Sequence, residues 1–127
     1  MTARLRLLIC DDDLMIRDAL CDVVGAEPDL EVVAVATDTD EAITLAEHHR
    51  PAVVVLDIRM PGGGGNRAAR EIRHRSPGTQ ILAFSAYDDT DAVTQMRLVG
   101  VTEYLIKGAT NVEILSTIRR LGRRAGD

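Results

Sequence analysis

The chain has 127 residues, of which 46% are hydrophobic and 28% charged, and its formal net charge is -5. This length and balance fit one globular domain. The negative charge and the 2% aromatic content argue against a nucleic-acid surface built from a basic patch with stacking aromatics. Cys10 and Cys21 lack metal-binding spacing, and no run reaches the roughly 18–20 apolar residues of a membrane span or fits a signal peptide. We therefore expect a cytoplasmic protein.

Apolar strand patterns alternate with helical patterns along the chain. Strands are predicted at residues 5–10, 31–36, 53–57, 80–85 and 104–106. The first helix runs over 14–25, the second begins at a capping box of Asp38 and Glu41 and ends before Pro51, and the fourth covers 88–99. A second capping box, Thr110 with Glu113, begins the last helix.

Four of the helices have an apolar stripe that predicts which side they bury. The predicted inner residues are Ile16, Leu20, Val23 and Val24 in the first helix, Ala42, Leu45 and Ala46 in the second, Ala68, Ala69 and Ile72 in the third, and Val112, Leu115, Ile118 and Leu121 in the last. Five strand–helix repeats predict an α/β fold, in which a doubly wound parallel sheet carries helices on both faces through right-handed crossovers.

Polar side chains stand where these strands end. They are Asp11, Asp12, Asp57, Ser85 and Lys107. Each alone has a simple structural explanation, such as a turn acid, a cap or a surface lysine. The carboxyl ends of parallel strands share one edge of the sheet, and ligands bind beyond that edge. The five residues together therefore predict a functional site there.

The chemistry of these five side chains favours phosphoryl transfer. Three carboxylates brought together repel one another, and Mg²⁺, which prefers oxygen ligands, would relieve the repulsion at Asp11, Asp12 and Asp57. Lys107 adds an ammonium and Ser85 a hydroxyl that can donate. A carboxylate can act as a nucleophile and form an aspartyl phosphate, which needs mainly positioning and charge neutralisation. These residues favour a site that modifies itself over an enzyme that turns over a separate substrate.

The sequence resembles the receiver domains of bacterial two-component response regulators over about residues 4–121. The resemblance rests on four motifs, namely Leu7-Leu8-Ile9-Cys10-Asp11-Asp12, Val55-Leu56-Asp57-Ile58-Arg59-Met60-Pro61 with Gly65, Ser85-Ala86, and Tyr104-Leu105-Ile106-Lys107-Gly108. It implies a flavodoxin-like (βα)5 three-layer sandwich with sheet order 2-1-3-4-5. It also implies a receiver domain over residues 1–121, with 122–127 a tail or the start of a linker.

The same resemblance implies how the site works. Asp57 would accept a phosphoryl group from the phosphohistidine of a histidine kinase or from a small phosphodonor. Asp12, Asp57 and the backbone carbonyl of Arg59 would hold Mg²⁺ directly, and Asp11 would act mainly through water. Lys107 would pair with the phosphoryl group. The chain would then be a signalling switch that catalyses only its own phosphorylation and dephosphorylation.

Ser85 and Tyr104 are the switch residues that the resemblance implies. Ser85 would move toward the phosphoryl group, Tyr104 would change rotamer, and the surface of the fourth helix, fifth strand and fifth helix would change. Expected partners are a sensor histidine kinase or phosphotransfer protein, a second copy of the chain, and a C-terminal output domain outside it. We expect no membrane and no direct nucleic-acid contact.

Several positions depart from the commonest family pattern. Ser85 stands where threonine is common and keeps the hydroxyl. Gly63 and Gly64 replace a bulky and an acidic residue, which indicates either extra loop freedom or simple tolerance of glycine. Arg59 and Tyr87 lie two residues beyond Asp57 and Ser85. By resemblance they are predicted to shield the phosphoryl group and tune its lifetime.

Three other functions compete with this interpretation. A pseudo-receiver would use the fold as a phosphorylation-independent interaction module, against which the complete acidic set with Lys107 argues. A metal-dependent phosphatase often needs a second acid where this chain has Arg59. A basic tail could also contact DNA, but cations at a helix end usually complement its dipole or belong to a linker; here they are Arg119, Arg120, Arg123 and Arg124.

Overall fold

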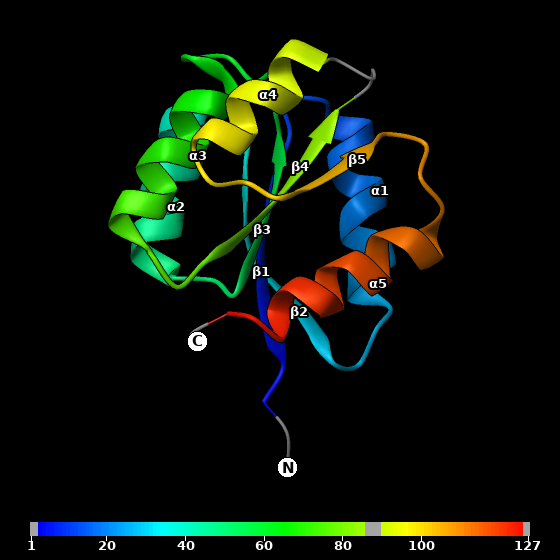
Figure 1. The fold of residues 1–127 in the computed structure, drawn as a ribbon. Coiled ribbons are helices and arrows are strands. Elements are labelled where there is room, and N and C mark those ends of the chain that lie inside the picture. Colours follow the sequence, from blue (N-terminus) through cyan, green and yellow to red (C-terminus); the bar gives the residue numbers. More distant parts are fainter. Residues whose placement is uncertain (1–2, 86–89, 126–127) are drawn as a thin grey trace.

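The computed structural model describes residues 3–85 and 90–125 (Figure 1). Within them strands and helices alternate strictly. The elements are β1 (Leu5–Cys10), α1 (Leu14–Gly25), β2 (Leu30–Ala36), α2 (Thr39–His49), β3 (Val53–Asp57), α3 (Gly64–Arg75), β4 (Gln80–Ser85), α4 (Thr90–Leu98), β5 (Glu103–Ile106) and α5 (Asn111–Gly122). These bounds agree closely with the sequence prediction, although β2 begins at Leu30 and Asp88 lies outside the described residues.

The five strands form one parallel sheet in the order β2-β1-β3-β4-β5. This order confirms the predicted 2-1-3-4-5 arrangement. Every residue of the central strand β3 is buried, as its unbroken apolar run predicted. Asp57 at the end of β3 lies opposite Phe84, and Ser85 at the end of β4 lies opposite Ile106. The strand register therefore brings these strand ends to one edge of the sheet.

Helices cover both faces of the sheet and enclose two separate cores (Figure 1). Helices α1 and α5 pack on one face, against Val53 and Val55 of β3. Helices α2, α3 and α4 pack on the other, against Val54 and Leu56. Consecutive residues of β3 thus point alternately into the two cores, which fixes the strand and the aspartate at its end. The three-layer α/β sandwich is confirmed.

Side chains cap the starts of α1, α2 and α5, with one difference from prediction. Thr110 and Glu113 form the complete capping box predicted for α5. At α2 only half of the predicted box is present. The Asp38 carboxylate accepts from the Glu41 N–H at 2.8 Å, but the Glu41 carboxylate accepts from the Thr37 N–H, also at 2.8 Å, and so reaches one residue further back than predicted.

The predicted inner face of α5 is partly wrong. Val112 is 76% exposed and Leu115 is only half-buried, whereas Ile114 and Thr117 are buried. The residues that face the core are Ile114, Thr117, Ile118 and Leu121. Both stripes contain Ile118 and Leu121 and both have helical spacing. Periodicity alone cannot choose between them, and the polar residue at Thr117 concealed the correct one.

Three of the four tail-proximal arginines form ion pairs within the domain: Arg124 Nη1 lies 3.8 Å from Glu103 Oε1, and Arg119 and Arg120 make shorter contacts. Arg119 of α5 donates from Nη2 to Glu27 at 2.7 Å and makes two bonds to Asp29, each of 2.9 Å. Arg120 donates from Nη2 to Glu103 of β5 at 2.9 Å. These contacts tie α5 to neighbouring elements and account for Arg119 and Arg120. Among the described helices, none combines the length and apolar character needed to cross a membrane.

Candidate functional site

Three aspartates gather at the carboxyl edge of the sheet. Asp11 and Asp12 follow β1, and Asp57 ends β3. Asp11 is 1% exposed, Asp57 is 4% exposed, and Asp12 is exposed to solvent. One carboxylate oxygen from each lies within 4.8 Å of the other two. The structure thus brings together the three acids that the strand ends predicted.

Lys107 lies against this acidic cluster. Its Nζ is 2.8 Å from Asp11 Oδ2 and 3.4 Å from Asp57 Oδ2, and its side chain is only 13% exposed. Three carboxylates and one ammonium carry a formal net charge of -2, which one divalent cation would balance. The donors are all oxygens, the chemistry that Mg²⁺ prefers. The residues present therefore fit a hard divalent ion.

Burial and mutual repulsion shift the ionisation of the cluster. Burial raises the pKa of Asp57 from 3.8 to about 6, the negative charge of Asp11 adds to this rise, and the Arg59 N–H and Lys107 oppose it. Burial alone would lower the pKa of Lys107. Its hydrogen bond to Asp11 and the charges of Asp57 and Asp11 outweigh burial, so its pKa is raised. The Lys107 ammonium therefore stays charged, whereas the ionised Asp57 carboxylate costs the folded protein free energy.

Backbone N–H groups orient the two buried carboxylates. The Asp13 N–H donates to Asp11 Oδ1 at 2.9 Å, and the Arg59 N–H donates to Asp57 Oδ1 at 3.1 Å. The second bond places the Arg59 peptide beside the Asp57 carboxylate. Asp13 itself caps α1, accepting from the N–H groups of Met15 at 2.9 Å and Ile16 at 3.2 Å. The third consecutive aspartate therefore has a structural role.

Ser85 ends β4 next to the cluster and is completely buried. Its carbonyl accepts from the Lys107 backbone N–H, which links the ends of β4 and β5. Tyr104 lies on β5, half-buried, and packs against the core under α2, α3 and α4. The Arg59 side chain is exposed directly beyond Asp57. Tyr87 lies outside the described residues, so its predicted shielding role stays a prediction.

Three consecutive glycines after β3 adopt a backbone conformation that other residues rarely occupy. The φ angles of Gly62, Gly63 and Gly64 are 93°, 110° and 75°. A β-carbon would strain the backbone at each of them, so in this conformation of the loop glycine is strongly favoured rather than merely tolerated. Gly65, which follows, allows a close approach, because a β-carbon there would lie 2.5 Å from Ile58 Cα.

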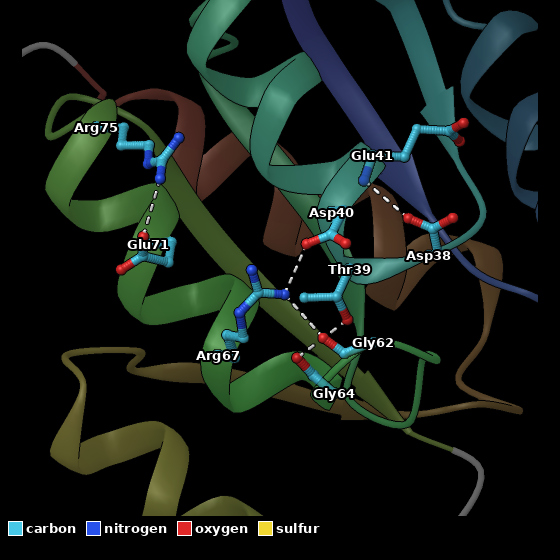
Figure 2. A network of polar contacts seen from close by, with 9 residues as sticks. All are labelled: Asp38, Thr39, Asp40, Glu41, Gly62, Gly64, Arg67, Glu71 and Arg75. Carbon is cyan, nitrogen blue, oxygen red and sulfur yellow. Dashed lines mark hydrogen bonds and ion pairs between the residues drawn. The ribbon is translucent and has the colours of Figure 1, made fainter.

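The glycine loop is held from two helices by contacts that the sequence analysis missed. Figure 2 shows Arg67 of α3 between Asp40 and Gly62, with Nη1 2.8 Å from Asp40 Oδ1 and 2.8 Å from the Gly62 carbonyl. Thr39 of α2 donates from its backbone N–H to the Pro61 carbonyl at 2.9 Å. We call Thr39, Asp40 and Arg67 the loop clamp. No sequence motif marks them, because the contacts that join the two helices and the loop, apart from Arg67 to Gly62, connect residues that are distant in the chain.

The comparisons with known proteins match almost the whole chain. A family model described as the response regulator receiver domain covers residues 7–119. The DNA-binding transcriptional activator DevR/DosR of Mycobacterium tuberculosis is 31% identical over 117 residues, covering 92% of this chain and 54% of that protein. A protein-glutamate methylesterase/protein-glutamine glutaminase of Shewanella frigidimarina is 36% identical, covering 94% of this chain and 33% of that protein. The chain therefore spans about half the length of these relatives or less.

Solved structures show the same architecture. A DNA-binding response regulator of the LuxR family from Staphylococcus aureus superposes with a TM-score of 0.87 at 26% identity, covering 93% of this chain and 98% of that one. The response regulator domain of Thermotoga maritima CheB gives a TM-score of 0.86 at 26% identity, with 94% and 97% covered. Both similarities extend across the sheet and its helices.

Proposed function

Because the chain belongs to the response regulator receiver domain family, we propose that Asp57 is its phosphoacceptor and that the protein is the receiver of a two-component phosphorelay. The observation that carries this proposal is the position of Lys107. The ammonium of this largely buried side chain lies within 3.4 Å of Asp57 and 2.8 Å of Asp11, at the edge where three carboxylates meet. A fixed cation and a nucleophilic carboxylate are the two groups that acceptance of a phosphoryl group needs.

Asp11, Asp12 and Asp57, with the backbone carbonyl of Arg59, are proposed to hold Mg²⁺. The ion would neutralise charge on phosphoryl oxygens as they approach. The bond from the Arg59 N–H to Asp57 Oδ1 supports this assignment, because it keeps the Arg59 peptide next to the carboxylate. Asp12, the exposed member of the three, lies on the open side of the cluster, and we assign Asp11 a role mainly through water.

The proposed reaction is attack by a carboxylate oxygen of Asp57 on the phosphorus of a phosphohistidine. The new P–O bond forms as the P–N bond breaks, and the donor imidazole leaves with the electron pair. Lys107 is proposed to pair with the incoming phosphoryl oxygens and the Ser85 hydroxyl to donate to one of them. A phosphomonoester carries about -1.5 to -2 charge near neutral pH. A change of that size at a strand end favours rearrangement of nearby contacts.

The proposed response passes through Ser85 and Tyr104 to the surface formed by α4, β5 and α5. The backbone bond from the Lys107 N–H to the Ser85 carbonyl supports this route, because it joins the two strand ends beside the site. Relatives include a DNA-binding transcriptional activator and a methylesterase, and each is longer than this chain. We propose that a partner or an output domain beyond residues 1–121 binds the surface of α4, β5 and α5 after phosphorylation has changed it. A cytoplasmic histidine kinase or phosphotransfer protein is proposed to supply the phosphoryl group.

Intact mass measurement tests the proposed function. The protein is incubated with Mg²⁺ and a small acyl phosphate, and then with a phosphohistidine donor, with Asp57→Ala and a chelator as controls. One phosphoryl adduct that needs Mg²⁺ and disappears in the variant is expected. A folded wild-type protein that takes up no phosphoryl group from either donor would instead favour a phosphorylation-independent interaction module.

A further inference from the structure

We propose that Arg67 is a positioning residue that holds the glycine loop against α2 and thereby sets the Mg²⁺ affinity of the acidic site. The proposal rests on the proposed function, because it concerns the same site. Arg67 lies on α3, outside the acidic cluster, and its guanidinium contacts Asp40 and the Gly62 carbonyl (Figure 2).

The loop that Arg67 contacts is part of the proposed metal site. Residues 58–63 connect β3 to α3, and the peptide of Arg59 lies beside the Asp57 carboxylate. The two ends of the loop are joined by the Gly65 N–H, which donates to the Ile58 carbonyl at 2.9 Å. Just before Gly65 stand three glycines at positive φ, which have no side chains to make contacts. Glycine has more unfolded and alternative conformations than other residues, so this glycine run depends on contacts from outside the loop for its order.

Those outside contacts are the loop clamp. The Thr39 N–H donates to the Pro61 carbonyl at 2.9 Å, and the Thr39 hydroxyl donates to the Gly64 carbonyl at 3.4 Å. Between these two points, Gly62 is held by Arg67 Nη1 at 2.8 Å. Figure 2 shows the side chains of Thr39 and Arg67 approaching the loop from their separate helices.

The glycine run and Arg67 fit each other sterically. A β-carbon at Gly63 would lie 2.8 Å from Arg67 Cδ. The arginine stem can cross the loop here because position 63 has no side chain. The single nitrogen Nη1 then bridges the Gly62 carbonyl and the Asp40 carboxylate. A surface ion pair of this kind contributes little by itself, since the Asp40 side chain is 76% exposed. We therefore assign the ion pair with Asp40 the role of orienting the Arg67 guanidinium toward the Gly62 carbonyl.

Losing the donor on Arg67 should therefore cost metal affinity. A freed Gly62 carbonyl would let the loop sample other conformations, and a cation would then have to order the loop as it binds. Changes to groups that orient metal ligands commonly cost about 10–100-fold in affinity. Arg67 contacts the loop at Gly62, three residues beyond Arg59. We therefore expect loss of the Arg67 donor to weaken Mg²⁺ binding by about three- to tenfold.

The first experiment compares Arg67→Met with Arg75→Met. Methionine keeps an unbranched apolar stem but lacks the donor. Arg75 is a matched control, because it lies on the same helix, has a similarly exposed side chain, and pairs with Glu47 of α2 at 3.0 Å and Glu71 at 3.1 Å, away from the loop. Mg²⁺ is titrated into each unphosphorylated protein and followed by amide chemical shifts. We expect Arg67→Met to weaken Mg²⁺ binding about three- to tenfold and Arg75→Met to leave it within about 1.5-fold.

A second readout needs no metal. In Mg²⁺-free buffer the Thr39 and Gly65 amides, which donate to the loop, should exchange hydrogen faster in Arg67→Met than in Arg75→Met. Arg67→Lys should restore most of the protection and affinity, since one ammonium can donate to both partners that Nη1 now serves. Phosphorylation of Arg67→Met should need more Mg²⁺ but reach the wild-type rate once Mg²⁺ saturates.

Equal Mg²⁺ affinity and equal loop exchange in the two methionine variants would overturn the role of Arg67. With wild-type phosphorylation intact, that result would leave the proposed function standing. A wild-type protein that binds no Mg²⁺ and takes up no phosphoryl group would overturn both. A reduced rate at saturating Mg²⁺ with unchanged affinity would also contradict the proposal, because it would indicate a role in the transfer step.

Discussion

Replacing Asp57 with asparagine should stabilise the metal-free protein at neutral pH. Asp57 is 4% exposed, and its carboxylate lies close to those of Asp11 and Asp12. Burial, with repulsion from Asp11, raises its pKa from 3.8 to about 6. An uncharged amide of nearly the same shape removes the buried charge and the repulsion. The Asp57→Asn variant therefore isolates the free energy that the folded protein loses by holding this charge.

The size and pH dependence of the effect follow from the two pKa values. A rise from 3.8 to about 6 corresponds to about 3 kcal/mol lost by the folded state when Asp57 is fully ionised. The folded state binds the proton more tightly than the unfolded state, so this loss is absent below the unfolded pKa, grows as pH rises from the unfolded pKa to the folded pKa, and is complete above the folded pKa. Allowing for imperfect burial of the amide, we expect Asp57→Asn to gain about 1–3 kcal/mol at pH 7.5 and close to nothing at pH 4.

Urea unfolding between pH 4 and pH 8, with a chelator present, measures this difference. Asp22→Asn is the control, because Asp22 is exposed on α1 and its change should stay within about 0.5 kcal/mol. Added Mg²⁺ should stabilise the wild-type protein more than Asp57→Asn, since the variant lacks one proposed ligand. A destabilised variant at pH 7.5, or a stability difference that does not change with pH, would refute the reasoning.

Two further predictions concern residues outside the acidic cluster. Burial strongly raises the pKa of Cys10, which is 1% exposed, whereas Cys21 is half-buried. A thiol reagent at pH 8 should therefore modify Cys21 first, which peptide mass mapping measures. Earlier modification of Cys10 would contradict this prediction. Gly65→Ala should lower the free energy of unfolding by about 2–3 kcal/mol, because its β-carbon would lie 2.5 Å from Ile58 Cα. Gly25→Ala, whose β-carbon would meet open space, should be neutral or stabilising in thermal unfolding. Equal effects of the two substitutions would argue against the close approach at Gly65.

Local sequence patterns were sufficient to predict most of the architecture. The run Val53–Leu56 predicted a fully buried central strand, and β3 is buried at every residue. The strand ends also identified the right neighbours, since Asp11, Asp57 and Lys107 lie in contact or close to it. This worked because the alternation of strands and helices fixes which ends share an edge of the sheet, without knowledge of any individual contact.

The missed features depend on contacts between distant segments. Arg67 reaches Asp40 across 27 positions of sequence, and no spacing rule connects an arginine on one helix to an acid on another. The buried face of α5 was misassigned for a related reason. Val112 is apolar and Thr117 is polar, yet Thr117 is buried and Val112 is not, because packing against the sheet decides which stripe turns inward. Such choices require the third dimension.

The placement of Lys107 connects the acidic site to the least secured edge of the sheet. β5 is an edge strand of four residues that pairs only with β4, and none of its residues is fully buried. Lys107 directly follows it, with Nζ nearer to Asp11 than to Asp57. A phosphoryl group on Asp57 would add negative charge and draw the ammonium away from Asp11. Because few buried contacts hold β5, we expect this strand to change conformation more readily than the central strands. Tyr104 lies on β5 and would move with it.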